Sequence, residues 1–302
     1  MRIGIDLGGT KIEGIALDDA GVVRGRLRVA TPRDQYEGTV EAIAGVVESL
    51  ERETGARATV GVGMPGAVSP ATGLVKNANS TWLIGRALDR DLAARLGRPV
   101  RLANDANCFA LSEAVDGAGR DGRVVFGVIV GTGTGGGVVV DRKVLTGPNA
   151  IAGEWGHNPL PWPQAGEWPG PPCYCGKTGC VETFLSGPGL ARDYREATGE
   201  SVPGPEVVAR AGRGEPAADA ALARYEGRMA RALAVVLNIL DPDVVVLGGG
   251  VSQVARLYEN VPKLWQASSF SDRVDTLLRP PVHGDASGVR GAAWLWGPGE
   301  GA

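Results

Sequence analysis

Asp105 is the carboxylate best placed for chemistry in this sequence, because it stands within Leu102–Asn107, where a short apolar strand passes into a helix. An aspartate at a helix start is most often only an N-cap. The alternative is a general base that accepts a hydroxyl proton. Phosphoryl transfer needs aligned reactants, Mg²⁺, electrostatic stabilisation and one carboxylate at the nucleophile. Asn104 would then hold a neighbouring hydroxyl, and this motif alone leaves both interpretations open.

Glycine-rich turns follow apolar strands at Asp6–Lys11 (DLGGTK), Gly131–Gly136 (GTGTGG) and Gly248–Gly250 (GGG). Glycine has no Cβ, so the backbone amides of such a turn can point together at a polyanion. In the first turn Gly8 and Gly9 supply amides, Thr10 and Lys11 add donors, and Asp6 can hold Mg²⁺, usually through water. A plain glycine hairpin is the alternative for any single turn. Three such turns together favour nucleotide binding.

The Gly131–Gly136 turn also matches the letters of the dinucleotide fingerprint G-x-G-x-x-G. That fingerprint needs a helix after the glycines and an acidic residue about 20 positions on. A strand, Val138–Val140, follows instead, so a second phosphate cradle fits better. The predicted cradle residues are Gly131, Thr132, Gly133 and Thr134. Gly248, Gly249 and Gly250 end a buried strand, where open α/β sheets bind ligands, or they form an ordinary helix-entry turn.

Cys173, Cys175 and Cys180 lie within eight residues, and His157 precedes them in the same aperiodic stretch. Three thiolates and one imidazole form a closed tetrahedral Zn²⁺ site. Redox chemistry and core packing are the weaker alternatives, and a disulfide does not suit a cytosolic chain. With four protein ligands the zinc is structural and pins the loop 154–182.

The same loop carries Glu154 and Glu182, which suit hydrogen bonding to sugar hydroxyls or are simply surface acids. Cys108 stands apart and is expected to be a buried helix residue.

The elements that must position these residues follow from periodicity. The expected strands are 2–7, 11–19, 21–30, 59–64, 100–103, 123–130, 138–141 and 244–247. The expected helices are 35–54, 88–96, 104–118, 218–239, one ending near 265, and 288–296. Residues 147–180 show no periodicity and are too long for a plain connection. Because both halves begin strand, glycine turn, strand, we predict a two-lobed α/β architecture.

Composition excludes several classes of protein. A net charge of −3 and a pI near 5.6 argue against a broad nucleic-acid footprint. The sequence contains no run of about 18 apolar residues, so we expect no membrane span. The sequence starts directly in strand and turn without a charged-then-apolar leader, so we expect a cytoplasmic protein.

As a set, these motifs resemble the ROK family, which contains bacterial sugar kinases and sugar-responsive repressors. The matching motifs are Asp6–Lys11 (DLGGTK), Gly63–Gly66 (GMPG), Ala103–Asn107 (ANDAN), Gly131–Gly137 (GTGTGGG), Glu154–His157 (EWGH), Cys173–Glu182 (CYCGKTGCVE) and Leu247–Gly250 (LGGG). They keep the family's order. The resemblance implies the actin/hexokinase-like fold (ribonuclease H-like motif), two-lobed with a central cleft. We expect lobes at 1–118, completed by a C-terminal helix 288–302, and at 119–287.

The resemblance also implies roles. Asp105 is the catalytic base. The sugar ligands are Gly66, Asn79, Asn104, Asp105, Glu154, His157 and Glu182, with His157 doubling as a zinc ligand. The Gly8–Lys11 and Gly131–Thr134 turns cradle the phosphates of ATP, and Gly248–Gly250 lies near adenosine. The implied cofactors are Mg²⁺, transient with ATP, and structural Zn²⁺. The implied partners are small molecules only, with no nucleic acid and no membrane, and the chain is expected to form a homodimer.

For the substrate, Lys76–Leu83, Glu154–Trp162 and the cysteine run look most like bacterial fructokinases that also accept mannose. The N-acetylglucosamine kinases of the family are similar over much of the chain but differ around Asn79–Trp82 and after His157. The expected reaction is phosphorylation of D-fructose to fructose 6-phosphate. The first alternative is another hexose or amino sugar: mannose, glucose or N-acetylglucosamine. At Ala67 some relatives that act on N-acetyl sugars have a larger, charged residue. A sugar-sensing repressor or a non-catalytic sugar-binding module is less favoured, because the phosphate strand begins at Arg2 and leaves no room for a DNA-binding helix-turn-helix.

Overall fold

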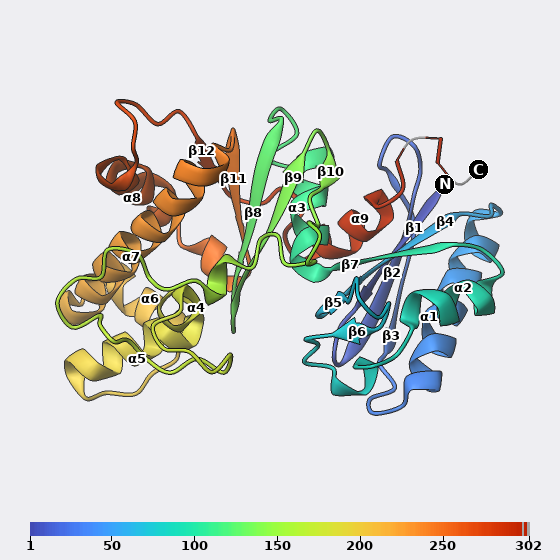
Figure 1. Cartoon of the computed structure of the whole chain (residues 1–302), viewed down its shortest axis with the longest axis horizontal. Helices are drawn as coiled ribbons and strands as arrows, with labels where there is room; N and C mark the ends of the chain where they lie inside the picture. The colour runs from blue at the N-terminus through green and yellow to red at the C-terminus, as the bar shows by residue number, and fades with distance from the viewer. Residues whose placement is uncertain (298, 301–302) are drawn as a thin grey trace. The chain divides into compact units, whose positions relative to one another are not determined.

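The computed structural model of the chain describes residues 1–297 and 299–300 (Figure 1). It forms two compact units. The first contains Met1–Arg120, Gly137–Ala152 and the chain from Val282 onward, and the second contains Asp121–Gly136 and Gly153–Pro281. The lobes expected from the sequence stay a prediction. Residues 298, 301 and 302 of the expected C-terminal helix lie outside the described residues.

The first unit is built on a mixed sheet. Its strands are β1 (Arg2–Leu7), β2 (Lys11–Leu17), β3 (Val23–Ala30), β4 (Thr59–Met64) and β7 (Val100–Asn104), in the order β3-β2-β1-β4-β7. The pairs β1–β2 and β2–β3 are antiparallel, so the three strands expected at the start of the chain form a meander. The pairs β1–β4 and β4–β7 are parallel, so these strands end at one edge of the sheet.

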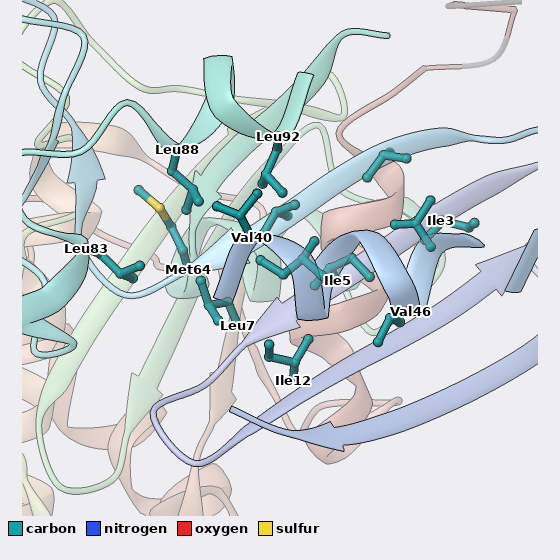
Figure 2. Close-up of a cluster of buried hydrophobic side chains, with 14 of the residues drawn as sticks. Ile3, Ile5, Leu7, Ile12, Val40, Val46, Met64, Leu83, Leu88 and Leu92 are labelled. Atoms are coloured by element: carbon teal, nitrogen blue, oxygen red, sulfur yellow. The ribbon is translucent and has the colours of Figure 1, made fainter. Parts of the chain in front are cut away.

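One face of this sheet is covered by α1 (Tyr36–Thr54) and α2 (Leu88–Leu96). Ile3, Ile5 and Leu7 alternate along β1 and point at this face, and all three are almost fully buried (Figure 2). The buried residues of α1 are Tyr36, Thr39, Val40, Ile43, Ala44, Val46, Val47 and Leu50, which confirms the predicted helical spacing. The helix ends at Gly55, whose φ of 66° suits a residue without a Cβ.

The opposite face is covered by α3 (Asp105–Val115) and α9 (Ser287–Trp294) (Figure 1). The helix α9 packs so closely that a Cβ at Gly4 would clash with the carbonyl of Val289. A Cβ at Gly291 would likewise clash with the carbonyl of Cys108. Cys108 is fully buried, as expected. The helix expected over 104–118 ends earlier, at Val115.

The second unit contains a parallel set of strands. These are β8 (Val124–Val130), β11 (Val244–Gly248) and β12 (Leu277–Arg279). A further strand, β9 (Thr134–Val140), begins in this unit and enters the first unit at Gly137, where it pairs with β10 (Lys143–Val144). The order is β10-β9-β8-β11-β12. The strand expected at 138–141 therefore starts earlier, inside the glycine run.

The helices of the second unit include the two expected ones, α7 (Pro216–Leu240) and α8 (Arg256–Trp265). Three shorter helices were not expected: α4 (Val181–Leu185), α5 (Gly187–Thr198) and α6 (Gly204–Gly212). Between His157 and Cys180 the loop has only isolated bridges, Pro159 with Cys180 and Pro172 with Thr178. Its predicted lack of periodic structure is confirmed.

The remaining elements are short. They are β5 (Ala67–Val68), β6 (Val75–Lys76), η1 (Thr81–Leu83), η2 (Trp155–His157), η3 (Gly250–Gln253), η4 (Gln266–Ser268) and η5 (Gly284–Ala286). Within the described part of the chain, none of the helices combines the length and hydropathy that crossing a bilayer requires.

Candidate active site

In the first unit, the strand register brings the predicted acidic residues to one edge of the sheet. Asp6 pairs with Gly63 across β1 and β4, and Gly63 pairs with Ala103 across β4 and β7. Asn104 and Asp105 follow directly at the end of β7. The carboxyl ends of parallel strands are where α/β sheets place their ligands, so this edge gathers Asp6 and Asp105 as candidates.

Asp105 is the first residue of α3 and its side chain is exposed. Its Oδ1 accepts the amide N–H of Ala106 at 2.8 Å. The N-cap is Asn104, whose Oδ1 accepts the same N–H at 2.9 Å and whose Nδ2 donates to the Gly66 carbonyl at 3.1 Å. The cap role considered for Asp105 therefore falls mainly to Asn104.

The carboxyl group of Asp6 is a weaker acid than an ordinary aspartate. Burial and the nearby charges of Asp105 and Glu13 raise its pKa to about 6, against the opposing effect of Lys11 and Arg28. Two carboxylates that disfavour each other's charge attract a cation, which fits the predicted Mg²⁺ role of Asp6.

The first glycine turn is closed by a hydrogen bond from the Gly8 amide to the Lys11 carbonyl, at 3.0 Å. Gly9, Thr10 and Lys11 are exposed and accessible to a ligand.

The two other predicted sugar ligands of this unit lie on either side of the β5–β6 hairpin. Gly66 has φ of 80°, and a Cβ there would clash with the Lys76 carbonyl. Backbone packing alone therefore requires glycine at 66. Asn79 follows the hairpin and is exposed.

In the second unit, two glycine turns share a sheet edge. Gly248 pairs with Ile129 of the parallel strand β8, and β8 leads into Gly131. Gly249 has φ of 78°, and a Cβ there would clash with the backbone of Val130. Gly250 opens η3 rather than an α-helix, with α8 starting at Arg256. The turn at Gly131 is closed by its amide, which donates to the Gly133 carbonyl at 2.9 Å.

The predicted metal ligands come together. The side-chain ligand atoms of His157, Cys173, Cys175 and Cys180 all lie within 4.8 Å of one another. The Sγ atoms of Cys175 and Cys180 are 3.6 Å apart, and Nδ1 of His157 is 3.6 Å from Sγ of Cys173. Zn–S bonds of about 2.3 Å place two sulfurs of a tetrahedral site about 3.8 Å apart. The geometry and donor set therefore fit Zn²⁺.

Two aromatic residues that the sequence did not single out support the predicted ligands. Trp155 donates from Nε1 to the Gly135 carbonyl at 3.0 Å and packs edge-on against Phe126, with ring centroids 5.8 Å apart. Tyr174 lies between two of the cysteines in the sequence, and its hydroxyl is 3.0 Å from Nε2 of His157. The only feature of the sequence that could have pointed to Trp155 is its position inside the EWGH motif. Glu154, from the same motif, is exposed.

A buried ion-pair cluster forms a second anchor of the 154–182 loop. Glu167 is 6% exposed, and its carboxylate accepts hydrogen bonds from Arg228 (2.8 Å) and Arg231 (2.9 and 2.8 Å) of α7. It also accepts the Gln164 amide N–H at 2.7 Å. Asp193 of α5 completes the cluster through Arg228, at 2.6 Å. Acidic residues this deeply buried are nearly always paired, and this pair ties the loop to the longest helix of the unit.

Comparison with known proteins identifies the family. A model of the ROK family matches residues 2–298, so the chain belongs to the ROK family, as its motifs predicted. It is 41% identical over 299 residues to the N-acetyl-D-glucosamine kinase of Photobacterium profundum, covering 98% of this chain and 99% of that protein.

Solved structures extend the comparison. A ROK hexokinase from Thermus thermophilus is 33% identical, with a TM-score of 0.86 over 97% of both chains. A ROK family glucokinase from Streptomyces griseus, in complex with glucose and AMPPNP, is 28% identical, with a TM-score of 0.75 over 97% of this chain and 98% of that one. The fold is therefore α/β and actin/hexokinase-like, as predicted.

Proposed function

We propose that this chain is an ATP-dependent sugar kinase whose preferred substrate is N-acetyl-D-glucosamine. The observation that carries the proposal is the 41% identity to an N-acetyl-D-glucosamine kinase over nearly the full length of both chains. The glucokinase from Streptomyces griseus, bound to glucose and AMPPNP, supports the same chemistry. The sequence favoured fructose, but the relatives support the alternative named beside it. Fructose remains the second candidate, on the local likeness of Lys76–Leu83 and Glu154–Trp162.

In the proposed reaction, Asp105 accepts the proton of a sugar hydroxyl while that hydroxyl attacks the γ-phosphate of ATP. Its exposed carboxylate at the start of α3 supports this role. Asn104 orients a neighbouring sugar hydroxyl and, through the Gly66 carbonyl, keeps the β4–β5 connection in place. Gly66 and Asn79 complete the sugar ligands assigned to the first unit. Glu154, His157 and Glu182 are those assigned to the second.

The glycine turns hold the nucleotide in this proposal. Gly8–Lys11 and Gly131–Thr134 contact the phosphates, and Gly248–Gly250 lies near the adenosine. Mg²⁺ bound with ATP neutralises charge that develops on the phosphates. Asp6 would hold it, and the mutual repulsion between Asp6 and Asp105 supports a cation there.

We also propose structural Zn²⁺ at His157, Cys173, Cys175 and Cys180. The convergence of the four ligand atoms supports it, and four protein ligands leave no open position for catalysis. The metal would fix the loop that carries Glu154 and Glu182. The expected homodimer and the cytoplasmic location stay predictions.

The test is a coupled ADP-release assay with N-acetyl-D-glucosamine, N-acetyl-D-mannosamine, glucose, mannose and fructose, comparing kcat/KM on zinc-loaded protein. We expect N-acetyl-D-glucosamine to give the highest value. A higher value for fructose would overturn the substrate assignment and keep the kinase. No turnover of any sugar would overturn the kinase itself and favour a sugar-binding module.

A further inference from the structure

The segment that directly follows the cysteine cluster contacts the glycine turn Gly131–Thr134 twice. Glu182, the second residue of α4, accepts the Thr134 amide N–H on its Oε2 at 2.9 Å. Gly187, the first residue of α5, donates its amide N–H to the Gly131 carbonyl at 2.8 Å. Both ends of the turn are thus fastened to one short stretch of chain, and all of these residues belong to the second unit.

The contact between Glu182 and the turn also explains one of its glycines. A Cβ at Gly133 would lie 2.6 Å from Oε2 of Glu182, too close for the carboxylate to keep its place. Glycine at 133 is therefore needed for the approach of Glu182. The Thr134 amide, in turn, is occupied by a carboxylate, and Thr134 itself is only 5% exposed.

The cysteine cluster lies immediately before this contact. Cys180 is the residue that precedes the first turn of α4, and its thiol contacts the His157 carbonyl, with Sγ 3.6 Å from the oxygen. On the other side of the turn, Trp155 holds the Gly135 carbonyl. The turn is thus held by residues flanking two of the cluster's ligands.

We propose that Glu182 is a positioning residue for the phosphate-binding turn as well as a sugar ligand. Oε2 fixes the turn through the Thr134 amide, which leaves Oε1 for a sugar hydroxyl. One carboxylate therefore links the sugar site to the nucleotide site, and the cysteine cluster fixes the helix that carries it. This inference rests on the proposed function, because it takes Gly131–Thr134 as a nucleotide-binding turn.

The test measures the Kd of Mg²⁺–ADP by calorimetry in the absence of any sugar, so that the sugar role of Glu182 cannot contribute. We compare wild type, Glu182→Ala and Glu182→Gln. The alanine variant loses the acceptor, and we expect about tenfold weaker ADP binding, the equivalent of one charge-assisted hydrogen bond. The glutamine variant keeps an oxygen for the Thr134 amide, and we expect its Kd to stay within about twofold of wild type.

Glu196→Ala is the matched control. Glu196 of α5 is an acidic residue of the same unit with a side chain 65% exposed and no assigned ligand, so its removal should leave the Kd of ADP unchanged. Zinc content and circular dichroism establish that each variant is folded. If Glu182→Ala does not fold, Glu182→Asp is the second variant, because its shorter side chain withdraws the carboxylate from the Thr134 amide without altering the turn itself. We expect the same loss.

Two results would overturn the inference. Unchanged ADP affinity in Glu182→Ala would leave Glu182 as a sugar ligand only. Tighter binding in both the alanine and glutamine variants would mean that its charge repels phosphate instead of supporting the turn. If wild type does not bind ADP, the proposed function fails, which is a different outcome from either.

Discussion

Replacing Glu167 with glutamine should strongly destabilise the second unit. The change keeps the shape of the side chain but removes the only carboxylate that contacts Arg231 among the described residues. Breaking a buried ion pair from one side costs about 3–5 kcal/mol, because the partner is left charged and uncompensated. Arg228 retains Asp193 at 2.6 Å, so only one guanidinium loses its carboxylate. We therefore expect about 3 kcal/mol, the lower end of that range.

The assay is equilibrium urea unfolding, with the free energy of unfolding taken from linear extrapolation. Glu196→Gln is the matched control. Glu196 faces Arg192 at 3.6 Å, but its side chain is 65% exposed, so its loss should change the free energy of unfolding by less than about 1 kcal/mol. Equal effects of the two substitutions would refute the assignment of Glu167 as an anchor of the loop.

The same cluster makes a pH prediction. Burial alone would raise the pKa of Glu167, but hydrogen bonds from the Gln164 amide, Arg228 and Arg231 outweigh burial and hold the pKa below its usual 4.5. A carboxyl whose pKa is lowered by folding contributes stability above its unfolded pKa and loses it as the pH falls. The difference in the free energy of unfolding between wild type and Glu167→Gln should therefore be largest at pH 7 and become smaller below pH 4.5. A gap that grows on acidification would contradict the ion-pair explanation.

Three further predictions concern the proposed active site. Asp105→Asn should lower kcat by at least about 10²-fold and move the KM for the sugar little, because a general base acts mainly in the transition state; wild-type turnover would refute it. Cys175→Ser should release zinc, seen by metal analysis, and raise the KM for the sugar through the loop, so full activity in zinc-free protein would refute the structural role. Asp6→Asn should abolish MgATP use yet stabilise the fold at pH 7 by roughly 3 kcal/mol, because the folded pKa of about 6 lies above the unfolded 3.8 and the native carboxylate loses stability as the pH rises through that window. Urea unfolding should show no such gain below about pH 4, and destabilisation at pH 7 would contradict the burial argument.

The sequence predicts the regular elements of the fold where side-chain periodicity is strong. The buried positions of α1 repeat at helical spacing, and the strands β1, β4 and β8 are apolar runs closed by glycine. The helices α5 and α6 were not predicted. Each starts with Gly-Pro, which is typical of turns as well as of first helical positions. Their apolar faces are defined by packing against α7, a long-range contact with no local signature.

For the candidate site, the sequence predicts the residues whose types are rare and clustered. The cysteines and His157 could be predicted as metal ligands, because few other functions explain the four residues together. In the structure their ligand atoms do come together. The supporting contacts are harder to predict. Glu167 reaches Arg231 across 64 positions, and Trp155 bonds a backbone carbonyl 20 positions away. Such pairs leave no periodic pattern, and the double contact of Glu182 and Gly187 with the glycine turn is of the same kind.

The close packing of α9 against the first sheet has a consequence for the order of folding during synthesis. Two carbonyls of α9 pack directly against glycines of the first sheet, where a Cβ would clash: that of Val289 against Gly4 and that of Ala292 against Gly61. Until α9 leaves the ribosome, this part of the first sheet stays exposed to water. The second unit contains no residue of α9 and can fold without it. The strand that begins the chain is covered on both faces only when the helix near its end packs against it.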